Sequence, residues 1–235
     1  RLIILAVAYV KDGLPYRKSV GRFLLDWLDD RDYIEATTSG STGVPKQIHL
    51  KKQGMVNSAL ATGEYLKLSP KDRALLCLPT DFIAGKMMLI RAIVLGLHID
   101  IIRPSSMPLS LTSKDYDFCA MIPLQAAKSL TDLPRVKKVI LGGASIDGEL
   151  EAKLQNISTE VYSSYGMTET ISHIAMRKVN HTEEHETTYK AMPNVIFTQD
   201  ERHCLVINAP LIADHPVVTN DMVNLISHNE FEWLG

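Results

Sequence analysis

The sequence has few cysteines, no excess of basic residues and no long apolar run, and each lack excludes a class of protein. The three cysteines, Cys77, Cys119 and Cys204, are far apart in sequence and set in apolar runs. This pattern indicates buried thiols in a reducing compartment rather than a disulfide framework or a zinc site. Lys and Arg number 25 against 27 Asp and Glu. The net charge of −2 does not favour nucleic acid or an anionic membrane as a partner.

The longest uninterrupted apolar run, Leu2–Val10, is far too short to cross a bilayer. Its Ala6-Val7-Ala8 triplet has hardly any apolar sequence before it, so we expect no signal peptide. These features favour a cytoplasmic protein. With 46% apolar and 22% charged residues, the 235-residue chain has the composition of a globular protein with a substantial core, built as one large domain or two small ones.

Apolar runs alternate with amphipathic segments along the first three quarters of the chain. Strands are expected at residues 33–37, 48–50, 74–78, 98–102, 117–122, 138–141 and 160–163, and helices at 19–28, 52–66, 84–95, 124–130 and 147–155. The opening run Leu2–Val10 fits a strand or a helix equally well. Alternation of this kind implies a parallel sheet with right-handed crossovers, in which ligands bind beyond the carboxyl ends of the strands.

After residue 176 the helical signals fade. Short strands are expected at residues 205–208, 216–219 and 222–227, and the polar stretch 178–188 is expected to form an exposed loop or hairpin. We therefore predict an α/β protein with a layered parallel-sheet core over residues 1–176 and a smaller β-rich subdomain over residues 177–235.

The stretch Thr37–Lys46, TTSGSTGVPK, has the composition of a phosphate-binding loop. Glycine lets the backbone approach an anion closely, and consecutive N–H groups in such a turn form an anion-binding nest. The hydroxyls add neutral donors, and the lysine adds a mobile positive charge. The alternative is an ordinary Ser/Thr/Gly surface linker. The residues expected to contact phosphate are Ser39, Gly40, Ser41, Thr42, Gly43 and Lys46.

The segment Ser39–Lys46 resembles the signature loop of the adenylate-forming superfamily, which includes acyl-CoA synthetases, luciferases and the adenylation domains of peptide synthetases. A second segment, Ser163–Thr170 (SSYGMTET), resembles the superfamily's Y-G-x-T-E signature. These enzymes join a carboxylic acid to AMP and then pass the acyl group to a thiol. The resemblance implies the fold of the superfamily's large N-terminal domain. It also implies a small carboxylic acid, ATP and coenzyme A as substrates, with Mg²⁺.

The second signature suits nucleotide chemistry. Tyr165 offers an aromatic face for adenine, and Gly166 permits a turn. Thr168 would donate to an α-phosphate oxygen, and Glu169 would supply a hard oxygen ligand for Mg²⁺. The alternative is a loop that starts a helix, because a threonine followed by an acidic residue is a typical N-terminal sequence. The resemblance adds Ser164 to the nucleotide contacts, Met167 and Ser172 to the substrate contacts, and Lys46, with Thr168 and Glu169, to the catalytic residues.

Two further segments resemble superfamily motifs. Gly142-Gly143-Ala144 follows an expected strand and is similar to a G-G-A segment whose backbone lines the acyl and adenine pocket. This similarity assigns Gly142 to the substrate, and Gly143 and Ala144 to the nucleotide. Taken alone, the two glycines are a tight turn. Thr219-Asn220-Asp221 resembles T-G-D, whose aspartate takes the ribose hydroxyls, with an asparagine that tolerates left-handed geometry in place of glycine. Taken alone, Asp221 is a turn aspartate before a strand.

Within that superfamily, two segments of the chain resemble segments of the o-succinylbenzoate–CoA ligases, which act in menaquinone biosynthesis. Tyr165–Ser172 matches their segment Y-G-M-T-E-T-x-S, although His173 stands where they have glutamine. Pro79–Gly85 resembles their P-L-F-H-I-S-G segment, with Phe82 in place of the histidine. That exchange would alter gating of the acyl pocket, so Phe82 is expected to contact the substrate.

Arg91 lies in the apolar helix that follows this segment. A substrate with a second carboxylate needs a cation to balance it in a pocket of low dielectric constant, and Arg91 would supply that cation. The alternative is an arginine that reaches solvent or pairs with Asp100.

Only 36 residues precede the expected phosphate loop, and the chain stops at Gly235, short of the superfamily's hinge. We therefore expect a compact nucleotide-binding core without the C-terminal lid domain. The resemblance implies an ATP-dependent acid–CoA ligase. The carboxylate attacks the α-phosphorus, pyrophosphate leaves, and the thiol of coenzyme A attacks the acyl-adenylate.

Two alternatives to an o-succinylbenzoate ligase stay open: another acyl- or aryl-CoA ligase, and a non-catalytic nucleotide-binding module. A hydrolase is disfavoured because the G-S-T-G segment lacks the G-x-S-x-G elbow. The sequence leaves open which acid is used and whether the protein is a homodimer.

Overall fold

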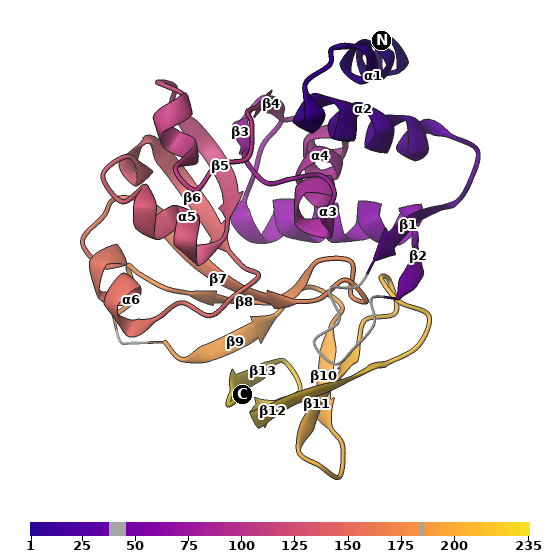
Figure 1. Cartoon of the computed structure of the whole chain (residues 1–235). Coiled ribbons are helices and arrows are strands. Elements are labelled where there is room, and N and C mark those ends of the chain that lie inside the picture. The colour runs from indigo at the N-terminus through magenta and orange to yellow at the C-terminus, as the bar shows by residue number, and fades with distance from the viewer. Residues whose placement is uncertain (38–45, 184–185) are drawn as a thin grey trace.

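The computed structural model describes residues 1–37, 46–183 and 186–235, and Figure 1 shows their arrangement. The helices are α1 (Leu2–Lys11), α2 (Pro15–Leu28), α3 (Lys52–Leu66), α4 (Ile83–Leu95), α5 (Pro123–Lys128) and α6 (Gly148–Leu154). The strands are β1 (Tyr33–Thr37), β2 (Gln47–Lys51), β3 (Arg73–Leu76), β4 (His98–Ile101), β5 (Tyr116–Met121), β6 (Val136–Leu141), β7 (Glu160–Gly166), β8 (His173–Lys178), β9 (Thr188–Ala191), β10 (Ile196–Gln199), β11 (Cys204–Asn208), β12 (Val217–Ser227) and β13 (Glu230–Trp233). Two short 3₁₀ helices lie at Pro108–Leu111 and Leu133–Arg135.

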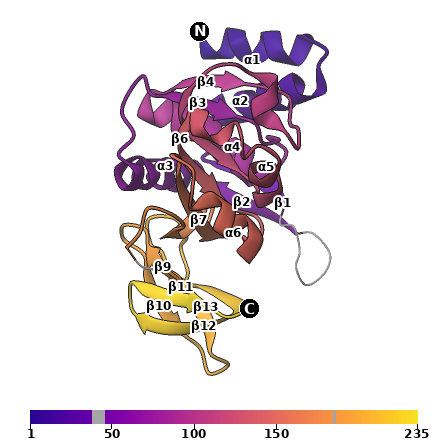
Figure 2. The same cartoon turned by 90° about the vertical axis from the view of Figure 1, so that its left-hand side faces the viewer.

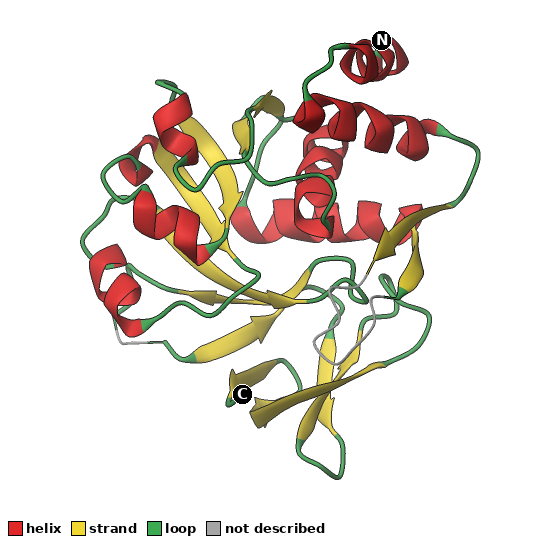
Figure 3. Ribbon diagram, viewed as in Figure 1, coloured by secondary structure: helices red, strands yellow, loops and turns green. Residues whose placement is uncertain are grey.

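One long sheet has the strand order β10-β11-β12-β13-β9-β8-β7-β6-β5-β3-β4, and β1 and β2 form a separate hairpin. Strands β4, β3, β5, β6 and β7 pair in parallel. From β7 through β8, β9, β13, β12 and β11 to β10 every pair is antiparallel. Figure 3 shows that the helices gather around the parallel half. The predicted α/β class with a parallel-sheet core is confirmed.

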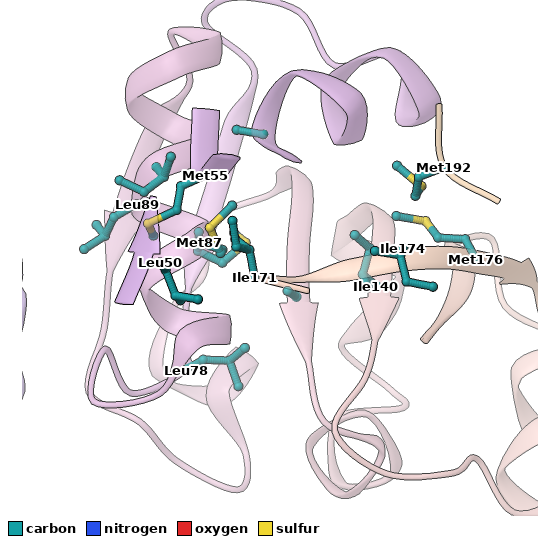
Figure 4. Close-up of a cluster of buried hydrophobic side chains, with 14 of the residues drawn as sticks. Leu50, Met55, Leu78, Met87, Leu89, Ile140, Ile171, Ile174, Met176 and Met192 are labelled. Carbon is teal, nitrogen blue, oxygen red and sulfur yellow. The ribbon is translucent and has the colours of Figure 1, made fainter. Parts of the chain in front are cut away.

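The parallel strands are buried on both faces. Phe118, Ala120 and Ile140 point into one hydrophobic cluster, which α3 and α4 cover. Cys119 and Val139 point into a second cluster, which α5 and α6 cover. Because both faces of these strands are covered, their sequences are continuous apolar runs rather than alternating apolar and polar residues. Figure 4 shows the first cluster continuing from α3 and α4 to the β8 side chains.

The antiparallel half differs from the expectation in several places. Strands β8, β9, β10 and β13 were not predicted, and the two strands expected at 216–219 and 222–227 are one strand, β12. Figure 2 shows β9–β13 gathered at one end of the molecule, beyond the helices. The expected boundary at residue 176 falls inside β8, which pairs with β7 on one side and β9 on the other. The division into a core and a β-rich subdomain stays a prediction.

The N-terminal segment is a helical hairpin. The opening run, which fitted a strand or a helix equally well, is the helix α1. Helix α2 begins at Pro15, four residues before the helix expected at 19–28. Proline suits the first turn because its missing N–H needs no partner there. A Cβ on Gly21 would lie 2.6 Å from the carbonyl oxygen of Ala6, so glycine lets α1 and α2 cross closely. None of the described helices has the length and apolar character needed to span a membrane.

The three cysteines are buried free thiols, as predicted. Two of them, far apart in sequence, meet in the fold: Cys77 Sγ lies 3.7 Å from Cys119 Sγ. Burial is the main reason that the pKa of Cys119 is raised well above its usual value, so this thiol stays protonated.

Candidate active site

The carboxyl ends of β5, β6 and β7 meet at one edge of the parallel sheet. At this edge the N–H of Gly142 donates to the Met121 carbonyl at 3.1 Å. A Cβ on Gly142 would lie 2.5 Å from Ser164 Oγ, which itself donates to the Leu141 carbonyl at 3.1 Å. Gly143 has φ +80°, a conformation that favours glycine. The fold therefore brings the G-G segment and Ser164, predicted separately, into direct contact.

The predicted Tyr-Gly-Met-Thr-Glu turn connects β7 to β8. Thr170 Oγ1 accepts from the N–H of Met167, and its single proton faces the backbone carbonyls of Met167 and Ser172, at 3.0 and 2.8 Å. A Cβ on Gly166 would lie 2.2 Å from the Ser172 carbonyl oxygen, which explains the glycine. The alternative of a helix start is wrong, because residues 167–172 form a turn between antiparallel strands. Within the turn, the Thr168 side chain is half-buried and Glu169 is exposed.

Tyr165 and Asp221 are hydrogen-bonded although 56 residues separate them. The phenol donates to Asp221 Oδ2, and the ring packs edge-to-face on Phe231 with centroids 5.2 Å apart. Burial, and then the neighbouring carboxylate, raise the pKa of Tyr165 far above its usual value, so the phenol remains a donor. The hydrogen bond fixes the direction in which the Asp221 carboxylate points.

Asp221 lies in the middle of β12, so the alternative of a turn aspartate before a strand is wrong. Asn220 does not have a positive φ, and the replacement of the motif's glycine therefore needs no left-handed geometry. Its amide oxygen accepts from Arg202 Nη1 at 3.0 Å, and Arg202 also pairs with Asp200 at 2.6 Å.

Arg91 is buried, with 2% of its surface exposed, in a network of neutral partners. Its Nε donates to Thr62 Oγ1 at 3.2 Å and its Nη2 to Ser172 Oγ at 2.7 Å. Nη2 also lies 3.5 Å from His173 Nδ1. Burial lowers the pKa of Arg91 to about 9, so the guanidinium is charged at neutral pH. Among the described residues no carboxylate lies within ion-pair distance of it.

The simpler alternative for Arg91 is wrong. The side chain does not reach solvent, and Asp100 instead pairs with Lys114 at 2.9 Å and accepts from Tyr116 at 3.1 Å. Phe82, the residue before α4, has 64% of its surface exposed. The assignment of Arg91 and Phe82 to substrate binding stays a prediction.

The family model described as "AMP-binding enzyme" matches residues 36–199. That match covers the G-G segment, the Y-G-M-T-E turn and all the parallel strands. The chain belongs to the AMP-binding enzyme family. The predicted superfamily is therefore confirmed.

Individual members of the AMP-binding family are similar over much of the chain. The 2-succinylbenzoate–CoA ligase of Salmonella typhimurium is 26% identical over 174 residues, which cover 73% of this chain and 38% of that enzyme. An acyl-CoA synthetase (AMP-forming)/AMP-acid ligase II-like protein from Dyadobacter fermentans is 36% identical, with a TM-score of 0.88 over 99% of this chain and 68% of that one.

The O-succinylbenzoate Coenzyme A Synthetase from Bacillus subtilis, solved in complex with ATP and magnesium ion, shares the fold, with a TM-score of 0.74 and 21% identity. The match covers 85% of this chain and 49% of that one. The matched part of this chain thus spans half or less of the two succinylbenzoate ligases.

Several predicted contacts of this AMP-binding chain lie outside the described residues: Ser39, Gly40, Ser41, Thr42 and Gly43. Their role stays a prediction. The structure does describe the residues on either side of this segment. Thr37 pairs with Gln47 at the end of the hairpin where the chain passes from β1 to β2, and Lys46 is the residue before β2. Among the described residues no three His, Cys, Asp or Glu side chains form a metal cluster. Glu169 as a magnesium ligand stays a prediction as well.

Two partners of Arg91, Thr62 and His173, were not predicted as site residues. Thr62 accepts from Arg91 and His173 and donates to the Ser58 carbonyl at 2.9 Å, yet it reads in the sequence as an ordinary helix residue. His173 was noted only as a departure from the family's glutamine. A signal was present: Ser58 and Thr62 are polar residues four apart on the face of α3 that is otherwise apolar and buried.

Proposed function

We propose that this chain is the nucleotide-binding part of an ATP-dependent acid–CoA ligase. The observation that carries the proposal is the contact between Tyr165 and Asp221, from two of the family's motifs. Beside it, Gly142 and Ser164 are in contact at the carboxyl edge of the sheet. A site at this edge is where open parallel sheets bind ligands.

Each motif then has a task. The ring of Tyr165 supports adenine, and the oriented Asp221 carboxylate accepts hydrogen bonds from the ribose hydroxyls. Thr168 donates to the α-phosphate. Lys46, with the loop that precedes it, neutralises the outer phosphates, so that pyrophosphate can leave. Glu169 presents an exposed carboxylate, the hard oxygen ligand that Mg²⁺ prefers, and the ion when bound supplies further charge neutralisation.

The proposed acid is o-succinylbenzoate, which carries two carboxylates. One would be adenylated, and the other would be balanced by a cation, for which we propose Arg91. A buried guanidinium surrounded by neutral partners supports this assignment, because it lacks the anion that usually accompanies a buried charge. The succinylbenzoate ligases among the relatives support it too. A place in menaquinone biosynthesis and a cytoplasmic location are part of the same proposal.

Calorimetric titration with ATP tests the nucleotide site. In Asp221→Ala the affinity for ATP should fall about 10- to 100-fold, the value of one or two hydrogen bonds to a charged acceptor. Asp115→Ala is the matched control, because Asp115 is exposed and precedes β5, at the opposite edge of the sheet. Equal affinities in the two variants would contradict the site.

Pyrophosphate exchange by the complete enzyme tests the reaction and the acid. Exchange that depends on o-succinylbenzoate is the expected result. Exchange with other aryl or acyl acids but not with o-succinylbenzoate would identify a different ligase. ATP binding without exchange for any acid would identify a non-catalytic nucleotide-binding module.

A further inference from the structure

Helix α1 is apolar on every side. Its run Leu2–Val10 holds no charged residue, and the one polar side-chain group in it is the phenol of Tyr9. One side of the helix packs on α2, where Ala6 is buried and Leu2, Tyr9 and Val10 are half-buried. A helix that is apolar all round is normally covered on every side, whereas a helix at the surface of a globular protein has a polar outer side. The outer side of α1 is therefore expected to have a partner.

The outer side of α1 is not covered by any of the described residues. Ile3 and Ile4 are 57% and 74% exposed, and Leu5 and Val7 are exposed as well. We call these four residues the α1 face. Figure 1 shows α1 lying outside α2, and Figure 2 shows it at the end of the molecule opposite to β9–β13. Apolar side chains gathered in this way mark a surface that binds a protein or a membrane.

The helical hairpin that bears the α1 face is positively charged, although the chain is not. Residues 1–28 have five basic side chains and two acids, a net charge of +3, in a chain whose net charge is −2. Both acids are paired: Asp12 with Arg17 at 2.5 Å, and Asp26 with Arg31 at 3.2 Å. The five basic residues are Arg1, Lys11, Arg17, Lys18 and Arg22. The net charge of the chain disfavoured an anionic membrane as a partner, but it conceals this uneven distribution.

Two of these cations lie beside the α1 face. Lys11 follows Ile3 by eight residues and Val7 by four, which places all three on one side of the helix. Arg1 directly precedes the helix. Both cations are exposed, and neither side chain has an ion pair with any of the described residues. The surface thus combines apolar side chains with unpaired positive charge.

An anionic lipid surface matches both properties. A second copy of the chain would bring an identical positive hairpin to the same contact, and the like charges would repel. At 10 residues α1 is too short to span a bilayer. A short helix with an apolar side and neighbouring cations can instead lie in the plane of the membrane, with its apolar side chains among the lipid chains and its cations among the headgroups.

We propose that the α1 face binds the surface of an anionic lipid membrane. Ile3, Ile4 and Val7 enter the boundary between headgroups and acyl chains, and Arg1 and Lys11 contact the lipid phosphates. The rest of the chain is negatively charged, so an anionic surface orients the molecule with the hairpin towards the lipid. The inference goes beyond the proposed function and does not depend on it, because no residue of the hairpin belongs to the nucleotide site.

Flotation with unilamellar vesicles tests the proposal. The chain and the complete enzyme should bind vesicles that contain equal parts of phosphatidylcholine and phosphatidylglycerol, and should bind phosphatidylcholine vesicles far more weakly. Binding should also weaken as the salt concentration rises, because salt screens the attraction between the cations and the lipid.

Two variants with opposite expectations separate the α1 face from other exposed apolar residues. In Ile3→Gln/Ile4→Gln the affinity for the anionic vesicles should fall about tenfold for each isoleucine removed. Leu60→Gln/Leu124→Gln is the matched control, since these leucines are 50% and 53% exposed on α3 and α5, and it should bind as the unmodified chain does. Glutamine is a good helix former, so both variants should keep the melting temperature and the affinity for ATP of the unmodified chain.

A third variant, Arg1→Gln/Lys11→Gln, tests the charges without altering the apolar side chains. Its affinity for the anionic vesicles should fall about fivefold for each cation removed.

Four results would overturn the inference. The first is that neither the chain nor the complete enzyme binds anionic vesicles, and the second is equal vesicle binding by the isoleucine and leucine variants. The third is a chain that does not bind vesicles but forms a dimer that Ile3→Gln/Ile4→Gln dissociates, which would make the face an interface between copies. The fourth is binding by the chain but not by the complete enzyme, which would show that another part of the enzyme covers the face. None of these results bears on the nucleotide site, which ATP binding tests separately.

Discussion

Lowering the pH below 6.5 is expected to destabilise the fold through the buried imidazole of His173. The side chain is 7% exposed, with Nε2 at 3.0 Å from Thr62 Oγ1 and Nδ1 at 3.5 Å from Arg91 Nη2. Burial, and then the positive charge of Arg91, hold the pKa of His173 well below its usual value. The ring is therefore neutral in the folded protein, with Nδ1 as the acceptor and Nε2 as the donor to Thr62.

The direction of this change in stability follows from the number of protons that the folded and unfolded chains bind. In the unfolded chain the imidazole takes up a proton near pH 6.5, whereas the folded chain excludes it. The unfolded state therefore binds more protons below pH 6.5, and the free energy of unfolding falls as the pH falls. One proton corresponds to about 1.4 kcal/mol per pH unit, so His173 should remove about 1.4 kcal/mol of stability between pH 7.5 and 5.5.

Urea denaturation at pH 7.5, 6.5 and 5.5 measures this effect when the chain is compared with His173→Gln. Glutamine does not titrate, and its amide keeps an acceptor for Arg91 and a donor for Thr62. Between pH 7.5 and 5.5 the free energy of unfolding of the unmodified chain should fall by about 1.4 kcal/mol more than that of the variant. His98→Gln is the matched control, because this side chain is exposed at the start of β4.

Parallel stability profiles for the unmodified chain and His173→Gln would refute the reasoning. They would mean that the folded protein accommodates an imidazolium beside Arg91. A profile that diverges equally in His98→Gln would show that the effect does not depend on burial.

Three other changes have defined outcomes. Tyr165→Phe should lower the free energy of unfolding, measured by urea denaturation, by about 1 kcal/mol. It should also weaken ATP binding, because Asp221 loses the donor that orients it. Unchanged affinity for ATP would show that the contact is only structural. Gly142→Ala should lower the melting temperature, because the new Cβ would lie 2.5 Å from Ser164 Oγ. The double variant Gly142→Ala/Ser164→Ala should recover most of that loss. An equal loss in the single and double variants would place the strain elsewhere. Asn180→Ala should lower the free energy of unfolding by about 3 kcal/mol in urea denaturation, since the buried amide hydrogen-bonds three backbone groups. A loss below about 1 kcal/mol would contradict that role.

Local sequence was sufficient for the parallel half of the fold. The predicted helix at 52–66 matches α3, and the cap Asp147 accepts from the Leu150 N–H at 2.8 Å, as an N-terminal aspartate should. The buried residues of α3 recur at helical spacing, and α6 has a side-chain cap, so both helices can be predicted without knowledge of their neighbours. Strands β9, β10 and β13 are only four residues long. Their periodicity is too short to be distinguished from that of a loop, and pairing with distant strands stabilises them.

The same distinction applies to the candidate site. The Y-G-M-T-E and G-G segments were recognisable because their glycines and hydroxyls serve a local backbone geometry. Arg91 was recognised only as an unusual cation. Its hydrogen bonds to Thr62 and Ser172 join residues 29 and 81 positions apart, and no local pattern predicts such a network.

The sequence by itself determined the family, the alternation of strands and helices and the segments that bear the chemistry, because each of these depends on residues close together in the chain. Only the tertiary structure decided that Tyr165 orients Asp221, that Arg91 is enclosed by neutral partners and that the α1 face is left exposed. These features depend on which side chains meet after long-range strand pairing and helix packing, and it is burial in that setting that shifts the pKa values of Arg91 and His173.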